Sequence, residues 1–595
     1  MRPLRLALAQ INPTVGDLEG NAGKMLMYVQ RAKEQGADII AFPELALTGY
    51  PPEDLLFKRQ FLDDARVQLD RLVAASGGLV VIVGVPDFEE GKTFNRAVPL
   101  APDMLDGRLY NAAAVAHDAQ LVTMYHKVLL PNYGVFDEAR YFTRGEECPV
   151  FTIQGVGVGV NVCEDIWYEV GPATVQRAAG AEIIVNINAS PYHRHKGGQR
   201  EQMLAKRAAD NGLYLAYVNT VGGQDELVFD GQSLLLDPLG EVVARGPQFE
   251  EALVVLDIDA DTVAASPSDG IETAGPLAHV GRPVRYHVSS QPDHKTVAPA
   301  APAMLCKPLD PLTEVYTALV TGTRDYVRKS GFTQAVIGLS GGIDSALTTA
   351  IAADALGAEN VTTFFMPSQY TAQQSLDDSQ KLVAGLGVRM DVLPIKRVFD
   401  AYLEELAPVF EGRAPDLAEE NIQARIRGNL LMAASNKFGW IVLTTGNKSE
   451  MATGYATLYG DMAGGFAVIK DVPKTLVQQL CRHLNQARGK EIIPESIIIR
   501  PPTAELRLDQ KDEDSLPPYA VLDPILEAYV EGDRTTDEMV REGMPPDIVA
   551  TVVKLVDRSE YKRRQAPPGV KITPRAFGRD RRLPIVNRYR PEIAG

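Results

Sequence analysis

The sequence contains few cysteines. Its 595 residues include only four, Cys148, Cys163, Cys306 and Cys481, which stand far apart and form no CxxC pair. A disulfide framework or a zinc knuckle would need cysteines at characteristic spacings. These two classes are therefore disfavoured, and a reducing cytoplasm is the expected compartment. The eight histidines show no ligand-like spacing either, so no structural metal is expected.

Long apolar runs are also missing. One of the longest, LVVIVGV at 79 to 85, is far shorter than the roughly 20 residues that a membrane-spanning helix needs. The first residues, MRPLRLALAQINP, lead directly into an expected strand and lack the apolar core and cleavage site of a secretory signal. We therefore expect no export and no membrane partner.

Positive charge is in deficit. Lys and Arg number 60 against 77 Asp and Glu, which gives a formal net charge of −17. The acidic residues are scattered along the chain, and such a composition disfavours binding to a phosphate backbone. We expect no nucleic-acid partner, whereas a small anionic substrate needs only a local basic pocket.

The length and the apolar pattern that are present indicate several α/β domains. One hydrophobic core usually serves roughly 100 to 200 residues, so two or more domains are expected. Short runs rich in Val and Ile alternate with helical stretches, which is typical of α/β layering. The strands expected in the first half are LRLALAQI, ADIIAFPE, LVVIVGV, AAAVAH, VGVGVNVC, AEIIVNI and YLAYVNTV.

A change of composition between about 258 and 305 predicts a domain boundary. The segments ASPSDGIETAGP and SSQPDHKTVAPAAPA are rich in Pro, Ser and Gly, and such segments do not build a core. After them, PLTEVYTALVTGTRDYVRKSG predicts an amphipathic helix that leads into the strand AVIGL at 335 to 339. A second α/β unit is expected to begin there.

The loop Ser340-Gly341-Gly342-Ile343-Asp344-Ser345 lies between that strand and a helix expected to end at Gly357. Glycines let the backbone turn tightly, and successive N–H groups at a helix N-terminus bind anions. The loop therefore predicts a phosphate site. It lacks the lysine of a GxxxxGK[ST] motif, so the loop does not predict transfer of the γ-phosphate. The SGGxDS pattern resembles the signature of the ATP pyrophosphatases, which implies cleavage of ATP to AMP and pyrophosphate, with Asp344 near magnesium.

Further motifs follow this loop over nearly the whole rear half. They are NIQARIRG at 421 to 428, TTGNKSE at 444 to 450, YGD at 459 to 461, Lys474, RPPTAELR at 500 to 507, SEYKRRQAPPG at 559 to 569 and the tail FGRDRRLPIVNRYR. Taken singly, Lys474 could be a solvated helix charge and Arg425 a surface ion pair. Together, the motifs resemble the NAD synthetase family.

That resemblance implies the substrate contacts of the rear half. ATP is implied to contact Ser340, Gly341, Gly342, Ile343, Asp344, Ser345 and Thr445. Deamido-NAD (nicotinate adenine dinucleotide) is implied to contact Asn421, Arg425, Glu450, Asp461, Lys474 and Lys562. Glu450 is alternatively a magnesium ligand together with Asp344.

Three polar residues of the front half stand at the ends of expected strands. They are Glu44 in FPELALTGYPPEDLL, Lys127 in YHKVLLPNYGVFDE and Cys163 in VNVCEDIW. A cysteine attacks an amide carbon only after losing its proton, so a carboxylate base and a cation for the oxyanion are its expected companions. On spacing alone, however, a cysteine after VGVGVNV is more often an inert core residue.

The segments around these residues resemble the nitrilase-type carbon–nitrogen hydrolases, specifically the glutaminase domains fused to NAD synthetases. The resemblance implies Cys163 as nucleophile, Glu44 as proton acceptor and Lys127 as oxyanion stabiliser, by way of a glutamyl thioester. It also implies glutamine binding by Tyr133, Glu164, Ser190 and Lys196, which could otherwise be turn and rim residues. One departure is His195, because relatives often have glycine before the lysine.

The two resemblances together imply an architecture and a reaction. We expect the α/β class: a nitrilase-like α-β-β-α sandwich at 1–275, a linker at 276–305, and at 306–595 a doubly wound, Rossmann-like parallel sheet of the adenine nucleotide alpha hydrolase type. The implied enzyme is a ligase that amidates deamido-NAD to NAD with ammonia from glutamine, with ATP as co-substrate and Mg²⁺ as cofactor. A homo-oligomer, from dimer to octamer, and an internal ammonia tunnel are further hypotheses.

Other functions remain open at this point. The front half could be a folded remnant, so that synthesis would use ammonium only, or the rear half could be a nucleotide sensor without chemistry. GMP and asparagine synthetases share an SGGxDS-like loop. An N-terminal-nucleophile glutaminase would need Cys at position 2, where this chain has Arg2, and a tRNA-thiolating enzyme would need paired cysteines and a basic surface.

Overall fold

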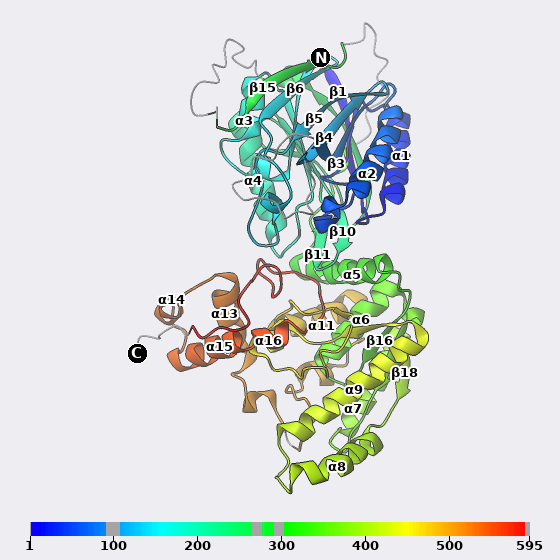
Figure 1. Cartoon of the computed structure of the whole chain (residues 1–595), viewed down its shortest axis with the longest axis vertical. Coiled ribbons are helices and arrows are strands. Elements are labelled where there is room, and N and C mark those ends of the chain that lie inside the picture. Colours follow the sequence, from blue (N-terminus) through cyan, green and yellow to red (C-terminus); the bar gives the residue numbers. More distant parts are fainter. Residues whose placement is uncertain are drawn as a thin grey trace. The chain divides into compact units, whose positions relative to one another are not determined.

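The computed structural model describes residues 2–90, 107–263, 277, 279–290, 303–508 and 510–589. The chain divides into two compact units (Figure 1). The first comprises Met1–Gln224 with Phe229–Leu309, and the second Asp225–Val228 with Asp310–Gly595. Each unit is described by itself. No helix in the described ranges is long and apolar enough to cross a membrane.

The first unit is built on two sheets. The six-stranded sheet has the order β14-β1-β2-β3-β4-β5, and the seven-stranded sheet the order β13-β12-β9-β8-β7-β6-β15. The first contains β1 (Pro3–Gln10), β2 (Ile39–Ala41), β3 (Val80–Glu90), β4 (Gly107–His117), β5 (Gln120–His126) and β14 (Ala252–Asp259). The second contains β6 (Glu147–Ile153), β7 (Val156–Val162), β8 (Ile183–Asn188), β9 (Tyr214–Asn219), β12 (Leu234–Leu236), β13 (Val242–Arg245) and β15 (Arg282–His287). A separate pair joins β10 (Val221–Gln224) to β11 (Leu227–Asp230).

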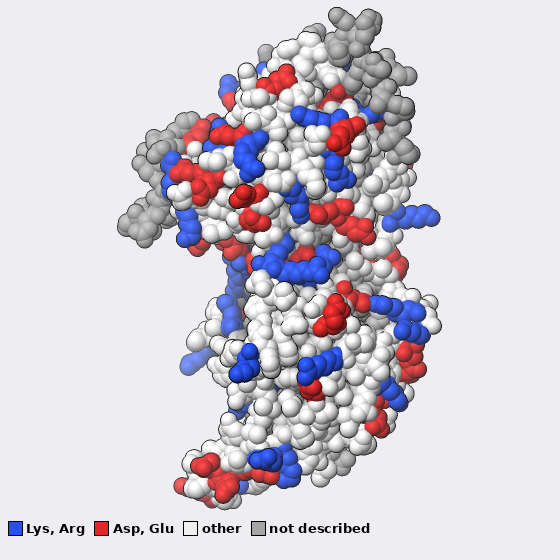
Figure 2. Space-filling view, turned by 90° about the vertical axis from the view of Figure 1, so that its right-hand side faces the viewer, with Lys and Arg blue, Asp and Glu red and all other residues white. Residues whose placement is uncertain are grey.

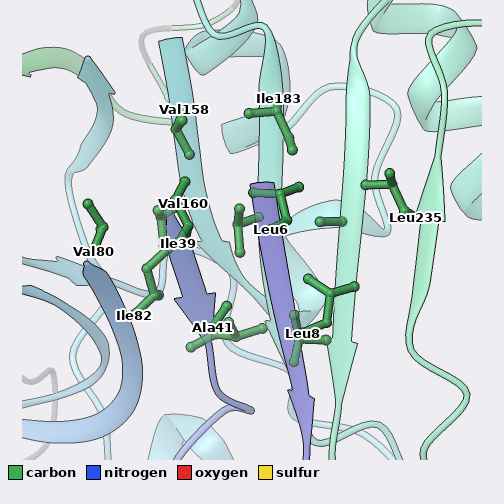
Figure 3. Packing of buried hydrophobic residues seen from close by; sticks show 14 of the residues in the cluster. Leu6, Leu8, Ile39, Ala41, Val80, Ile82, Val158, Val160, Ile183 and Leu235 are labelled. Carbon is green, nitrogen blue, oxygen red and sulfur yellow. The ribbon is translucent and has the colours of Figure 1, made fainter. Parts of the chain in front are cut away.

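The two sheets pack face to face through alternating apolar residues. Leu6 and Leu8 of β1 lie in one core cluster with Val160 of β7 and Ile183 of β8, all almost fully buried (Figure 3). Because successive side chains of a strand point to opposite faces, Ala7 of β1 belongs instead to the cluster beneath the helices. The sequence pattern of β1 therefore serves two interfaces at once.

Helices cover the outer faces of both sheets (Figure 1). The helices α1 (Leu18–Glu34) and α2 (Arg59–Ala74) pack on the first sheet, and α3 (Pro172–Ala178) and α4 (Lys196–Asn211) pack on the second. Short 3-10 turns are η1 (Glu53–Phe57), η2 (Glu138–Arg140), η3 (Cys163–Ile166) and η4 (Ala260–Thr262). The predicted α-β-β-α sandwich is confirmed.

The second unit contains one parallel sheet of order β18-β17-β16-β19-β20. Its strands are β16 (Ala335–Gly338), β17 (Val361–Phe365), β18 (Arg389–Val392), β19 (Ile441–Thr444) and β20 (Phe466–Ala467). The chain moves outward from β16 through β17 to β18, and then returns to the other side of β16 as β19. This reversal makes the carboxyl end of β16 a topological switch point, where open α/β sheets bind ligands. The doubly wound fold is confirmed.

Helices connect and extend this sheet. They are α5 (Pro311–Lys329), α6 (Ile343–Leu356), α7 (Gln373–Leu386), α8 (Lys396–Phe410), α9 (Leu417–Phe438), α10 (Lys448–Thr453), α11 (Lys474–Arg488), α12 (Glu495–Ile499), α13 (Tyr519–Leu526), α14 (Thr536–Arg541), α15 (Pro546–Arg558) and α16 (Glu560–Arg563), with turns η5 (Ala358–Asn360), η6 (Asp512–Asp514) and η7 (Glu527–Glu531). The predicted helix α5 is confirmed, and Gly357 ends α6 with φ of 92°.

The segment expected as a linker contains a strand. Residues Arg282–His287 form β15, which pairs in parallel with β6, Arg282 opposite Glu147 and His287 opposite Thr152. The strand lies at the sheet edge and is only partly buried, so its sequence RPVRYH lacks the apolar run that marks the inner strands. Residues 291–302 of the expected linker lie outside the described residues.

The surface carries charges of both signs. On the face drawn in Figure 2, Lys and Arg are interspersed with Asp and Glu. That distribution agrees with the scattered acidic residues of the sequence.

Candidate functional site

In the first unit, Cys163 occupies a tight turn immediately after β7. Its φ is 48°, in the left-handed region, and its side chain is buried. The turn is held by Asp165, whose Oδ2 accepts hydrogen bonds from Val162 N at 3.1 Å and Tyr125 OH at 2.7 Å. Its Oδ1 accepts from Leu129 N at 2.8 Å, in the segment that carries Lys127. One buried carboxylate thus fixes both the cysteine turn and the lysine segment.

Lys127 lies between two carboxylates. Its Nζ donates to Glu44 Oε1 and to Glu138 Oε1, both at 2.8 Å, and all three side chains are buried. Glu44 follows β2, Lys127 follows β5 and Glu138 opens η2. The backbone N–H of Ala189 donates to the other oxygen of Glu44, Oε2, at 3.0 Å. The fold therefore brings Glu44 and Lys127, 83 residues apart, into direct contact.

The electrostatics of this group follow from burial. Burial raises the pKa of the Cys163 thiol well above its usual value, and the charge of Glu44 adds to that effect, while Lys127 opposes it. Burial lowers the pKa of Lys127, but the charges of Glu138 and Glu44 outweigh it and raise that pKa. The pKa of Glu138 is raised to about 7 by burial, against the opposing charge of Lys127. The resting thiol is therefore protonated and needs a proton acceptor to react.

Among the residues implied in glutamine binding, Tyr133 and Glu164 are joined by hydrogen bonds. Tyr133 OH donates to both oxygens of Glu164 at 3.0 Å, and burial raises the pKa of that carboxylate. Ser190 N donates to Asn219 Oδ1 at 3.0 Å. Lys196 Nζ donates to Pro191 O at 2.7 Å and lies 6.0 Å from the Trp167 ring centroid.

The departure at His195 has a structural explanation. Its φ is 68°, in the left-handed region, and it forms the N-cap of α4 immediately before Lys196. Glycine adopts this conformation without a steric penalty, whereas histidine does so only rarely.

Sequence reasoning gave no role to Glu138 or Asn111. Glu138 stands 11 residues after Lys127, within the quoted GVFDE, and was not singled out. Asn111 lies in β4, and its Nδ2 donates to Glu44 Oε1 at 2.7 Å. The only signal for it was a single amide inside the apolar run LYNAAAVAH.

In the second unit, the predicted phosphate loop connects β16 to α6 at the switch point. Gly341 has φ of 81°, and a Cβ at this position would lie 2.6 Å from Ser375 O. The serine hydroxyls brace the turn: Ser345 Oγ donates to Gly342 O at 2.9 Å, and Gly342 N donates to Ser340 Oγ at 3.2 Å. Only glycine fits position 341 without displacing α7.

Thr445 lies at the same edge of the sheet. It follows β19, which pairs in parallel with β16, Ile337 opposite Leu443. Because the carboxyl ends of adjacent parallel strands lie side by side, Thr445 stands next to the segment that carries Ser340.

A buried ion network lies beside the phosphate loop. Lys474 Nζ donates to Asp344 Oδ2 at 2.5 Å and to Glu450 Oε1 at 3.3 Å. Asn447 Nδ2 donates to Asp344 Oδ1 at 3.0 Å. Burial raises the pKa of Glu450 to about 8, with the charge of Asp344 adding to it and that of Lys474 opposing it. The structure thus brings together Asp344, Glu450 and Lys474 from three separate sequence motifs.

The other residues implied in deamido-NAD binding gather on segment 454–461. Thr457 Oγ1 donates to Asn421 Oδ1 at 2.8 Å, and Thr457 N donates to Asp461 Oδ1 at 2.7 Å. Arg425 Nε donates to Leu458 O at 3.2 Å. Lys562 Nζ donates to Gly454 O at 2.7 Å and Ala456 O at 2.8 Å. One short segment therefore collects side chains from α9 and α16.

Arg427 is a residue that sequence reasoning quoted without assigning a role. Its Nε donates to Met366 O at 3.0 Å, directly after β17, and burial lowers its pKa to about 10. This places a guanidinium near the carboxyl edge of the sheet. Its polar neighbourhood in α9, which includes Arg425, gave no signal that would single it out.

The candidate metal ligands are carboxylates of the ion network. Within the ranges that the structure describes, no group of three or more His, Cys, Asp and Glu is placed to hold a metal ion. Asp344 and Glu450 both face Lys474 Nζ, so two carboxylate groups converge there.

Two family models match the chain. The one described as carbon-nitrogen hydrolase matches residues 5–267, and the one described as NAD synthase matches residues 315–566. A glutamine-dependent NAD(+) synthetase of Thermotoga maritima is 48% identical over 100% of both chains. One of Aquifex aeolicus is 44% identical over 98% of this chain and 100% of the relative.

Solved structures agree with these matches. The glutamine-dependent NAD+ synthetase from Acinetobacter baumannii, in complex with ADP, shares 40% identity with a TM-score of 0.71 and covers 98% of this chain and 99% of its own. One from Cytophaga hutchinsonii, at 20% identity and a TM-score of 0.77, covers 98% of both chains and shows the same fold. With a nitrilase-type unit, an ATP-pyrophosphatase-type unit and full-length relatives that carry both, the chain belongs to the family of glutamine-dependent NAD(+) synthetases.

Proposed function

We propose that this chain is a ligase that converts deamido-NAD, ATP and glutamine into NAD, AMP, pyrophosphate and glutamate. The observation that carries the proposal is that each unit contains a cluster of polar side chains suited to one of the two reactions. Cys163, Glu44 and Lys127 belong to the first group, and the braced loop with Asp344 belongs to the second. Family membership over the full chain supports the pairing of the two activities.

In the first unit, Glu44 takes the proton of Cys163, and the thiolate attacks the amide carbon of glutamine. Lys127 stabilises the negative charge that develops on the carbonyl oxygen. Its ion pairs with Glu44 and Glu138 keep it protonated in a buried site. Collapse of the tetrahedral intermediate releases ammonia and leaves a glutamyl thioester, which water hydrolyses to glutamate.

The glutamine is held by four side chains in this proposal: Tyr133, Glu164, Ser190 and Lys196. Glu164 and Lys196 carry opposite charges, as a zwitterionic amino acid requires. Tyr133 already donates to Glu164, so the hydroxyl fixes the orientation of that carboxylate.

In the second unit, an oxygen of the nicotinate carboxylate attacks the α-phosphorus of ATP, and pyrophosphate leaves. The N–H groups of the loop 340–345 and the N-terminus of α6 bind the outer phosphates. Ammonia then attacks the acyl adenylate, so that the amide forms and AMP departs. Thr445 contacts ATP, and Asn421, Arg425, Glu450, Asp461, Lys474 and Lys562 contact deamido-NAD.

Mg²⁺ fits the chemistry of the donors beside the loop. Asp344 and Glu450 supply the hard carboxylate oxygens that Mg²⁺ prefers, and it usually takes only one or two of them together with substrate phosphates. When bound, the ion neutralises charge on the pyrophosphate oxygens. Burial, with a further contribution from the charge of Asp344, raises the pKa of Glu450, and a bound cation would favour its ionised form.

The compartment and the assembly complete the proposal. All four cysteines are free thiols, which supports a reducing cytoplasm. We propose a closed homo-oligomer, between dimer and octamer, because symmetric assemblies are the usual form of soluble oligomers. Light scattering coupled to size exclusion would measure the number of subunits.

Substitution of Cys163 tests the division of labour. We expect Cys163→Ala to abolish glutamine-supported synthesis, because the variant has no nucleophile, and to retain ammonium-supported synthesis within about twofold. The measurement is NAD, AMP and glutamate formation with each nitrogen source. Equal loss with both sources would contradict the assignment of separate sites, and retained glutamine use would contradict the role of Cys163.

A further inference from the structure

Asn111 is the only amide side chain among the described residues that donates a hydrogen bond to Glu44. It lies in β4 and is fully buried. Its Nδ2 is 2.7 Å from Glu44 Oε1 and 3.5 Å from Glu138 Oε2, and its backbone oxygen accepts from Lys127 N at 2.8 Å. One residue thus contacts the base, the second carboxylate and the backbone of the lysine.

The chemistry of the neighbours fixes the orientation of this amide. The carboxylate of Glu44 only accepts hydrogen bonds when ionised, so the NH₂ group and not the carbonyl must face its Oε1 at 2.7 Å. The remaining carbonyl oxygen, Asn111 Oδ1, is buried and has no hydrogen-bond partner among the described residues. An unpaired buried carbonyl is unfavourable for folding, so this arrangement is not the one that stability alone would select.

We propose that Asn111 is a positioning residue that holds Glu44 in its ionised form and in the orientation needed to accept the Cys163 proton. Hydrogen bonds donated to a carboxylate favour its charged form. Lys127 supplies one such bond to the same oxygen, but it is shared with Glu138. A neutral donor between two carboxylates adds stabilisation without adding a charge that would have to be compensated. The proposal rests on the proposed role of Glu44 as base.

Several charged and titratable groups face Glu44 and set its electrostatic environment. They are Lys127, Glu138, Cys163, Tyr50 and Glu164. Only Lys127 among them is cationic. Loss of the Asn111 donor therefore leaves Glu44 with two remaining partners among the described residues, the ion pair to Lys127, which Glu138 shares, and the N–H of Ala189.

The experiment uses the full-length enzyme and the variant Asn111→Leu, which keeps the shape of the side chain and removes the donor. We expect the acidic limb of the pH profile of glutamine-supported kcat/KM to move by about one unit to higher pH. At neutral pH the value of kcat/KM should fall roughly 10- to 100-fold, since a general base contributes about 100-fold or more. The pH dependence of Cys163 alkylation by iodoacetamide should shift in parallel, and ammonium-supported synthesis should stay within about twofold.

Gln10→Met is the matched control, because it deletes another buried amide of the same unit. The side chain of Gln10 bonds Pro247 O, Glu250 O and Ser233, none of which belongs to the catalytic group. Its pH profile should match the wild type. An equal shift in Gln10→Met, or an unshifted profile in Asn111→Leu, would overturn the proposal.

A second variant covers the case in which Asn111→Leu does not fold. Asn111→Asp is isosteric and places a third carboxylate beside Glu44 and Glu138, so it should move the acidic limb to higher pH as well. An unchanged limb in a folded Asn111→Asp variant would overturn the proposal. A failure of the base assignment itself would be seen separately, as retained glutamine use in a Glu44→Gln variant.

Discussion

At the scale of single residues, burial decides the chemistry of the glutaminase group. Lys127 and Glu44 are fully enclosed, and a buried ion pair is maintained only when each charge keeps its partners. Lys127 has two acidic partners, so the group as a whole carries an excess of negative charge unless one carboxylate is protonated. Glu138, with its pKa raised to about 7, is the group that holds that proton.

Glu138 should therefore make stability depend on pH. Its folded-state pKa of about 7 lies above the ordinary value of 4.5, so its protonated form is favoured by folding. This contribution is present below about pH 4.5 and is lost as the pH rises through about 7. We expect the free energy of unfolding of the wild type to fall by up to roughly 3 kcal/mol between pH 4.5 and 8 because of this group.

Glu138→Gln removes the titration and keeps the shape of the side chain. Gln resembles protonated Glu, so the two unfolding free energies should be similar at low pH, and the variant should become more stable than the wild type by up to roughly 3 kcal/mol as the pH rises to about 8. Urea unfolding monitored by Trp167 fluorescence, in a Trp440→Phe background, measures the first unit because these are the two tryptophans. A difference that stays constant with pH would show that Glu138 does not titrate in this range.

At the scale of elements, two helices bring the synthetase residues together. Glu450 lies in α10 and Lys474 begins α11. Asp523 of α13 connects the two helices, because its Oδ1 accepts from Ser449 Oγ at 2.5 Å and its Oδ2 from Thr475 N at 2.9 Å. A buried carboxylate outside the recognised motifs thus fixes the relative position of two helix N-termini.

The strand-to-helix turn at Gly341 gives a test at this scale. We expect Gly341→Ala to reduce ammonium-supported kcat/KM for ATP by roughly 100-fold, because the added Cβ would meet the backbone of Ser375 and displace the loop. Glutamine hydrolysis should be retained. Gly489→Ala is the control: Gly489 also has a positive φ, of 62°, but its Cβ would enter open space, so only about 1 kcal/mol of stability should be lost. Equal kinetic losses in both variants would contradict the role of the loop.

Prediction from sequence succeeded where a single local pattern determined the element. Eight apolar strands, helix α5 and the glycine turn before α6 were predicted, because alternation, amphipathic spacing and glycine each act locally; other apolar strands, such as β14 and β17, were not. The partly exposed edge strand β15 was not predicted, because pairing with β6 stabilises it and its composition does not indicate a strand.

The candidate site shows the same division. The sequence motifs around Cys163, Glu44 and Lys127 identified these three residues. The contact between Glu44 and Lys127 became visible only in the folded structure. Asn111 and Asp523 could not be identified, because each acts through partners distant in sequence. The residues next to each of them in the sequence do not indicate those partners.

At the scale of the whole molecule, the chain combines two reactions that need different environments. The first unit buries a thiol, a lysine and two carboxylates, which suits attack on a neutral amide. The second presents backbone N–H groups at the switch point of a parallel sheet, which suits a polyphosphate. Free ammonia is largely protonated at neutral pH and ammonium is not a nucleophile, which gives a physical reason to carry both reactions on one chain.

The central claim is that the loop 340–345 directs attack to the α-phosphorus of ATP. Deamido-NAD labelled with ¹⁸O in its nicotinate carboxylate tests it most directly, with ammonium as nitrogen source and mass spectrometry of the nucleotide products. The account predicts AMP that carries one ¹⁸O atom, because the carboxylate oxygen that attacks the α-phosphorus leaves with AMP. Formation of ADP, or of AMP without the label, would contradict it.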